Sequence, residues 1–178
     1  MGPDGDMTQL NAMFEEWAAW CAQVYDSHTS LPVLLWFRSK HRGHSWITGL
    51  GVVTDAAITF AALVPDAERG PAMKLYRQSL RLVTGLAERV GLDPNPEVGP
   101  LDSRLWSVGY SAFEQFGVPM RSFDDSLVRS RALREPFHAH MEAFIDELVA
   151  PRGFWGVTSA DHLAEADLES LFDPEPND

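Results

Sequence analysis

The most apolar part of the chain runs from Ser45 to Val64 and contains a single ionisable residue, Asp55. Its apolar side chains are spread around every side of a helix instead of along one face, which is typical of the centre of a soluble bundle or of a membrane span. A charged residue in the middle of a span costs about 2.5–3.5 kcal/mol, whereas each Leu, Ile, Phe or Val returns only about 0.3–0.6 kcal/mol. The pattern therefore predicts a buried helix, at about 45–64, in the centre of a soluble domain.

Apolar positions three and four residues apart predict further helices on both sides of this one. The predicted helices are 8–28, 33–40, 71–90, 101–116, 126–149 and 160–172. No segment alternates apolar and polar residues over four to eight positions, as a half-buried strand does. The predicted fold class is all-α: a single-domain bundle of six or seven helices around the buried central helix.

Three parts of the chain differ in composition. Residues 1–7, MGPDGDM, resemble a disordered lead-in or the remnant of an expression tag, and are excluded from the predicted fold. Residues 8–156 form the predicted helical domain. Residues 157–178 form an acidic C-terminal helix and tail, with no Lys or Arg after Arg152. Its thin apolar edge predicts docking on the bundle or on another chain, and fraying in solvent is the alternative.

The net charge and the cysteine content limit the classes of protein to which the chain can belong. The chain of 178 residues has 26 Asp and Glu against 14 Lys and Arg, a net charge of −12, which argues against a nucleic-acid partner. Its one cysteine, Cys21, excludes an internal disulfide and fits a reducing compartment. The N-terminus shows no signal segment, so the expected location is the cytoplasm.

The basic turn FRSKHRGHSW, residues 37–46, directly precedes the central helix and is the predicted ligand site. A buried Asp55 needs a cation or hydrogen-bond donors, and this turn is the obvious source. Ser45 is a candidate N-cap, so free backbone N–H groups would face the same place and favour a small anion. The candidate ligand-binding residues are Arg38, His41, Arg42, His44, Ser45, Trp46 and Asp55. The alternative is a solvated basic turn without a ligand.

A metal site is the second interpretation of the same region. Its ligands would be His28, His41, His44 and Asp55, because imidazole and carboxylate are common ligands. The neighbouring arginines oppose a cation, so an anion is preferred. No nucleotide-binding or acyl-transfer motif is present, and neither a cofactor nor catalytic residues are predicted. A non-enzymatic role is favoured over an enzymatic one.

Several short motifs resemble those of a known family. The first block contains Asp26-Ser27-His28, Pro32, Phe37-Arg38-Ser39, His41, Ser45-Trp46 and Asp55. It is similar to the pattern (E/D)SH-x-SYP…FRSQH-x-x-QSW…LD of the cytosolic C-terminal region of bacterial two-transmembrane, potassium-channel-like membrane proteins. The later pieces that agree are Gly117-Val118-Pro119-Met120-Arg121, Arg131, Glu135-Pro136, Pro151 and Trp155. The chain departs from the family pattern at Leu31 and Arg134, where the family has Tyr, and at Lys40 and His44, where it has Gln.

The resemblance implies a non-enzymatic cytosolic domain that serves regulation or assembly, as a homo-oligomer, with a membrane-embedded parent or partner. The chain itself has neither a TVGYG-like filter nor a second long apolar segment, so pore activity is not expected in it. Two alternatives stay open. One is a helical protein that binds a small anion or a metal, with or without enzymatic activity, around Arg38, His41 and Asp55. The other is a protein-interaction module that acts through the acidic tail.

Overall fold

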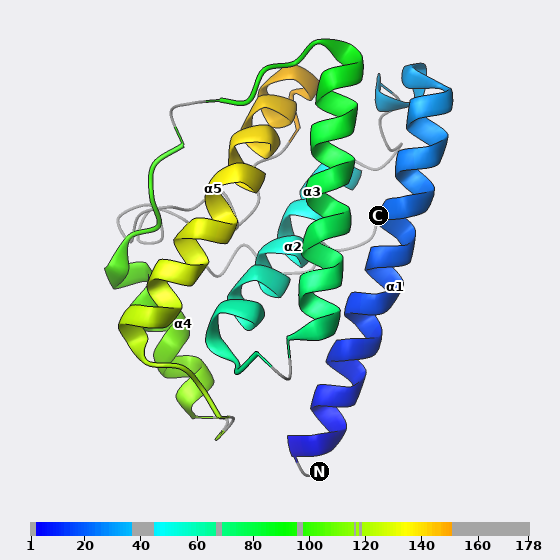
Figure 1. Ribbon diagram of the computed structural model, residues 1–178. Coiled ribbons are helices and arrows are strands. Elements are labelled where there is room, and N and C mark those ends of the chain that lie inside the picture. The colour runs from blue at the N-terminus through cyan, green and yellow to red at the C-terminus, as the bar shows by residue number, and fades with distance from the viewer. Residues whose placement is uncertain are drawn as a thin grey trace, which may run out of the picture.

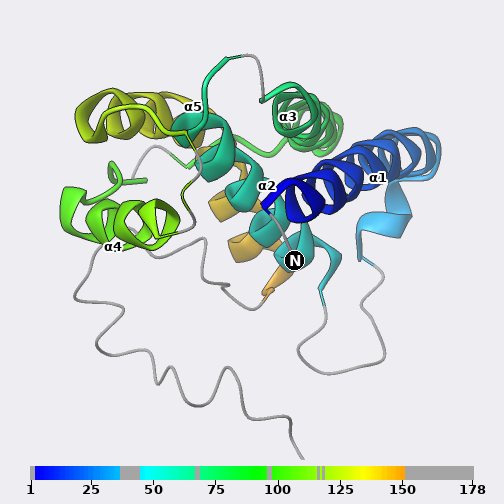
Figure 2. The same ribbon diagram turned by 90° about the horizontal axis from the view of Figure 1, so that it is seen from below.

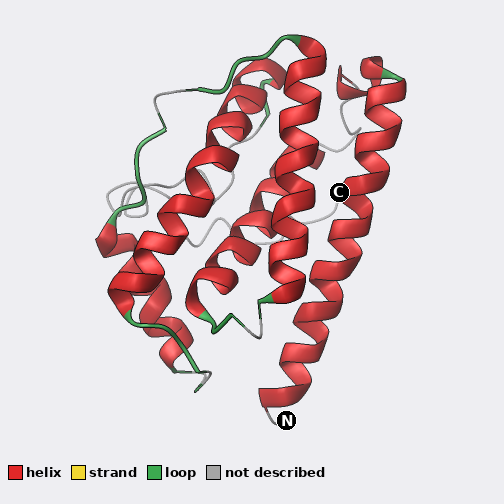
Figure 3. Ribbon diagram, in the orientation of Figure 1, coloured by secondary structure: helices red, strands yellow, loops and turns green. Residues whose placement is uncertain are grey.

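The computed structural model describes residues 3–36, 45–66, 69–95, 98–115, 117 and 119–150, with side chains from Met7 onward. Within these ranges the structure consists of helices joined by loops and turns, with no strand (Figure 3), and the all-α prediction is confirmed. The elements are α1 (Pro3–Ser30), the 3₁₀ helix η1 (Pro32–Trp36), α2 (Trp46–Leu63), α3 (Gly70–Val90), α4 (Ser103–Glu114) and α5 (Phe123–Leu148).

The predicted count of six or seven helices is wrong, since the described residues form five α-helices. In the part of the helix expected at 33–40 that is described, the chain forms a 3₁₀ helix, Pro32–Trp36, beginning with a bond from Leu34 N to Leu31 O (3.0 Å). Residues 37–40 lie outside the described residues. The helix expected at 160–172 lies outside the described residues. The first helix begins at Pro3, inside the segment expected to be a lead-in; proline is tolerated in a first turn because its missing N–H has no partner there.

Helices α1 and α3 lie side by side, and α3 also packs against α2 and α5 (Figure 1). Helix α2 runs antiparallel to α3, and it also packs against α5 and, with fewer contacts, against α1. Seen from below, α4 lies at the edge of the bundle beside α5 and away from α1 (Figure 2). The long apolar helix α2 therefore packs between α3 and α5.

Helix α2 is largely buried but not enclosed on all sides. Eleven of its residues are buried, including Ile47, Leu50 and Phe60. However, Val52 is 49% exposed and Ala56 is also exposed, so its predicted place as a fully enclosed central helix is not confirmed. Among the described residues α2 alone is long and apolar enough to cross a membrane; a buried core helix passes the same test, and 61% of α2 is buried in the bundle.

A close approach between α1 and α3 depends on glycine. A Cβ atom added to Gly85 would lie 2.5 Å from Cε2 of Tyr25, well inside van der Waals contact. Moving the Tyr25 ring away would also disturb its cation–π contact with Arg81, whose guanidinium lies 4.9 Å from the ring centroid. Glycine is unfavourable inside a helix, so its presence here reflects the space that Tyr25 needs.

We expect Gly85→Ala to lower the free energy of unfolding by about 1 kcal/mol, because the cost of overpacking exceeds the gain in helix propensity. Gly109→Ala is the matched control, since nothing lies within 4 Å of its added Cβ. That control should instead stabilise the protein by about 0.5–1 kcal/mol. Urea denaturation measures both, and stabilisation by Gly85→Ala would contradict the packing described.

Candidate ligand-binding site

Asp55, the one charged residue of α2, is paired with two side chains of α5. Arg134 Nη1 donates a hydrogen bond to Asp55 Oδ1 at 2.6 Å, and His138 Nε2 lies 3.3 Å from the same oxygen. The side chains of Arg134 and His138 are only 9% and 2% exposed, and that of Asp55 is 20% exposed. Asp55 is thus paired with a cation, as expected, but its described partners belong to α5. The expected partners Arg38, His41 and His44 lie outside the described residues.

The apolar face of α5 fixes this arrangement. Phe137, Met141 and Phe144 are all buried in the core, which sets the rotation of α5 about its axis. Arg134 and His138 are four residues apart, so they lie one turn apart on the same side of the helix. That side faces Asp55, and the two polar residues therefore reach one carboxylate oxygen together.

Burial lowers the pKa of His138 below its ordinary value, and the nearby Arg134 guanidinium acts in the same direction. The hydrogen bond with Asp55 and the charges of Asp55 and Glu142 oppose this shift but do not cancel it. His138 is accordingly neutral at pH 7. A neutral imidazole that meets a carboxylate oxygen with Nε2 must hold its proton on Nε2.

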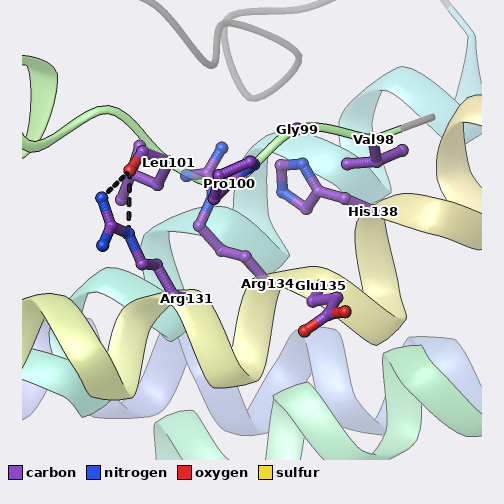
Figure 4. A pocket seen from close by; sticks show the side chains of 8 residues that line it. All are labelled: Val98, Gly99, Pro100, Leu101, Arg131, Arg134, Glu135 and His138. Atoms are coloured by element: carbon purple, nitrogen blue, oxygen red, sulfur yellow. Dashed lines mark hydrogen bonds between the residues drawn. The ribbon is translucent and has the colours of Figure 1, made fainter. Parts of the chain in front are cut away.

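A pocket of about 150 Å³ lies beside this cluster, between α5 and the segment that precedes α4 (Figure 4). It is lined by Val98, Gly99, Pro100, Leu101, Arg131, Arg134, Glu135 and His138. The side chains of Arg131, Arg134 and His138 extend toward the 98–101 segment, whereas the carboxylate of Glu135 points away from it. Two guanidinium groups and one imidazole thus border a single small cavity.

Three hydrogen bonds attach the pocket wall to α5. Arg131 donates to the carbonyl oxygen of Leu101 through Nε (3.0 Å) and Nη2 (2.8 Å), and Leu101 itself is buried. Upstream, the backbone N–H of Asn95 donates to the carbonyl oxygen of Ala139 at 2.8 Å. The segment before α4 is therefore bonded to α5 at Asn95 and at Leu101, the last of its residues that lines the cavity. Such a preformed cavity with convergent cationic donors suits a small anion, which guanidinium groups bind with planar, charge-assisted hydrogen bonds.

Most of the predicted site residues cannot be compared with this cluster. Arg38, His41, Arg42 and His44 lie outside the described residues. Ser45 flanks the first turn of α2 without a side-chain capping bond, and Trp46 packs against the ring of His28, with centroids 5.5 Å apart. Ten residues of helix separate Ser45 from Asp55, about 15 Å along the axis. The start of α2 and Asp55 are thus too far apart to bind the same small ligand.

The residues predicted for the site did not include Arg131, Arg134 or His138. One signal was available: Arg134 and His138 are polar residues at a spacing of four, next to the apolar positions Phe137 and Met141. A polar pair beside an apolar stripe indicates a buried polar contact, but only the packing of α5 on α2 shows that the contact is with Asp55.

The alternative metal site finds no support among the described residues, where no group of three or more His, Cys, Asp or Glu could hold a metal ion. His28 Nδ1 lies 3.0 Å from the carbonyl oxygen of Val24 and 3.0 Å from Ser27 Oγ, both within α1. Asp55 is instead paired with α5. The other two proposed ligands, His41 and His44, lie outside the described part of the chain.

Comparisons of the chain with protein-family models, curated proteins and solved structures found no match. The proposed function therefore depends on the residues themselves, that is, on the short motifs of the sequence and on the geometry around Asp55.

We expect Asp55→Ala to lower the free energy of unfolding by about 2–3 kcal/mol, because it leaves the buried Arg134 without its carboxylate. The partial exposure of Asp55 keeps the loss below that of a fully buried pair. The exposed pair of Lys74 with Glu15 is the control, and Glu15→Ala should change stability by less than about 0.5 kcal/mol. Equal effects of the two substitutions in denaturant melts would contradict a structural role of the internal pair.

Stability should also fall as the pH drops below about 6.5, the ordinary pKa of histidine. Because the pKa of His138 is lower in the folded state, the unfolded chain binds a proton that the folded chain does not bind in this range. Unfolding is therefore favoured by acid until the pH reaches the folded pKa. The pKa of His28 is lowered as well, chiefly by burial, so its effect has the same sign.

The two contributions can be separated by urea melts over this pH range. His138→Gln should reduce the pH dependence more than His28→Gln, because His138 is the more deeply buried of the two. A pH dependence that His138→Gln leaves unchanged would show that this histidine does not titrate differently on unfolding.

Proposed function

We propose that this chain is a non-enzymatic, ligand-binding regulatory domain whose ligand is a small anion, bound in the pocket between α5 and residues 98–101. The observation that supports it best is the convergence of Arg131, Arg134 and His138 on one cavity of about 150 Å³. That volume suits phosphate, sulfate or a small carboxylate. Two guanidinium groups favour such anions over metal cations, which they repel.

The link from the pocket to α2 supports a regulatory role. Arg134 borders the pocket and is also the ion-pair partner of Asp55. An anion that binds Arg134 competes with Asp55 for its hydrogen bonds, so binding alters the contact between α5 and α2. A ligand changes a conformational equilibrium only through such a difference in contacts between states.

The resemblance to the cytosolic region of two-transmembrane, potassium-channel-like proteins supports the wider setting that we propose. In that setting the chain works in the cytoplasm as a homo-oligomer, together with a membrane-embedded parent or partner. Asp55 and Arg131 both belong to the shared motifs, whereas Arg134 replaces a tyrosine of the family pattern. We infer that this replacement gives the chain a second guanidinium in the pocket, so its ligand is more acidic than that of proteins with the tyrosine.

Calorimetric titration with phosphate, sulfate and acetate, beside zinc and nickel, tests the proposal. We expect saturable anion binding that Arg131→Gln weakens about tenfold, because the substitution removes a charge-assisted bond. Arg131 makes its described bonds through Nε and Nη2, so Nη1 is the nitrogen that would reach the ligand. Arg129→Gln is the matched control: Arg129 lies on the same helix, where it pairs with Asp125, and does not line the pocket.

Absence of anion binding, or equal weakening by Arg131→Gln and Arg129→Gln, would contradict an anion site at this pocket. Tight zinc or nickel binding that His41→Ala abolishes would instead support the metal alternative at the basic turn.

A further inference from the structure

A second pocket, of about 280 Å³, opens between α1, α2 and α4, and Asp55 is one of the residues that line it. Its lining is Leu10, Phe14, Val52, Asp55, Ala56, Thr59, Phe60 and Phe113. Asp55 is the only ionisable group among these residues. The pocket is therefore an apolar concavity with one carboxylate, whereas the pocket on the α5 side is bordered by cationic groups.

The partners of Asp55 in α5 contact only one of its two carboxylate oxygens. Both described bonds, from Arg134 and from His138, end on Oδ1. No described residue donates a hydrogen bond to Oδ2. Since Asp55 is partly exposed and lines the apolar pocket, Oδ2 is the atom that can accept from a ligand bound there.

The walls around this carboxylate are aromatic and aliphatic. The side chains of Phe14 and Phe60 are fully buried, and their rings pack with centroids 5.7 Å apart, so they form the inner wall of the pocket. Val52 and Ala56, by contrast, are exposed and stand at the rim on α2. A ligand in this pocket would bury its apolar part against these side chains, and one charged oxygen of Asp55 would lie at the edge of that apolar surface.

We propose that this pocket binds a small hydrophobic amine in its ammonium form, with the apolar part over Phe14, Phe60 and Phe113 and the ammonium group hydrogen-bonded to Oδ2 of Asp55. A cation fits better than a neutral or anionic head group for two reasons. The accepting atom is a carboxylate oxygen, and charge-assisted bonds are about twice as strong as neutral ones. Aromatic faces attract cations as well, and the net charge of −12 favours them over anions at long range.

Calorimetric titration of the full chain with benzylamine, and in parallel with the neutral analogue benzyl alcohol, tests this site. Benzylamine is expected to bind saturably at one site and benzyl alcohol at least about fivefold more weakly. Asp55→Asn should weaken benzylamine binding about tenfold. Asp26→Asn, at an exposed position on α1 that does not line the pocket, removes the same charge and should have no effect.

Asp55→Asn also disturbs the pair with Arg134, so a second variant leaves the pair intact. Ala56→Met places a larger side chain at the exposed rim and should abolish benzylamine binding by filling the pocket. Ala132→Met, at an exposed position of α5, is its control and should bind normally. Neither substitution touches Arg131, Arg134 or His138, so this site and the anion pocket are tested separately.

Three results would overturn the proposal. The first is no saturable benzylamine binding by the full chain, and the second is binding that survives Ala56→Met. The third is evidence that protein covers the pocket: a dimer in light scattering that Ala56→Met dissociates, or benzylamine binding that appears only after residues 157–178 are removed.

Discussion

The internal pair between Asp55 and Arg134 is the constraint on which the arrangement of α2 and α5 depends. A carboxylate in an otherwise apolar helix costs several kcal/mol if it is buried without a partner, so α2 can pack only where a cation meets it. Arg134 meets it from α5 at 2.6 Å, and His138 adds a second contact one turn later. Apolar packing between α2 and α5 would allow several rotations of each helix. The shared oxygen of Asp55 selects one of them.

A second polar contact fixes α2 on the opposite side. The hydroxyl of Thr54, the residue next to Asp55, donates to Ser79 Oγ of α3 at 2.8 Å, and Ser79 lies 3.5 Å from Cys21 Sγ of α1. All three groups are buried, and burial raises the pKa of Cys21 to about 11, so the thiol is unreactive at neutral pH. Consecutive residues of α2 therefore point to different neighbours, Thr54 to α3 and Asp55 to α5. These two contacts determine both the rotation and the height of α2 in the bundle.

The helices follow from local features of the sequence, whereas the described partners of Asp55 do not. The absence of charge around Asp55 and the apolar periodicity of the other segments are local features, and they were sufficient for the fold class and for α2, α3 and α5 to within a few residues. The partner of Asp55 is not a local feature. The basic turn at 37–46 is the nearest cationic segment in the chain, whereas Arg134 is 79 residues away. Proximity in the sequence therefore could not identify the described partners of Asp55, because the packing of α5 on α2 brings Arg134 and His138 to the carboxylate. The expected partners in the basic turn, at residues 37–44, lie outside the described part of the chain.

The ion pair of Asp55 with Arg134 has one member at each of two pockets, and this has a thermodynamic consequence. Arg134 borders the pocket on the α5 side, and the carboxylate that it binds borders the apolar pocket on the other side. A ligand that attracts either member of the ion pair weakens its hold on the other member. An anion bound to Arg134 would make Asp55 a better acceptor for an ammonium group, and an ammonium group at Asp55 would release Arg134 for an anion. Because binding free energies are reciprocally linked, the two effects must be equal, and the coupling between the pockets would be positive. A single ion pair between two helices would therefore be sufficient to connect the two proposed sites, which have opposite charge preferences, without any change in the fold around them.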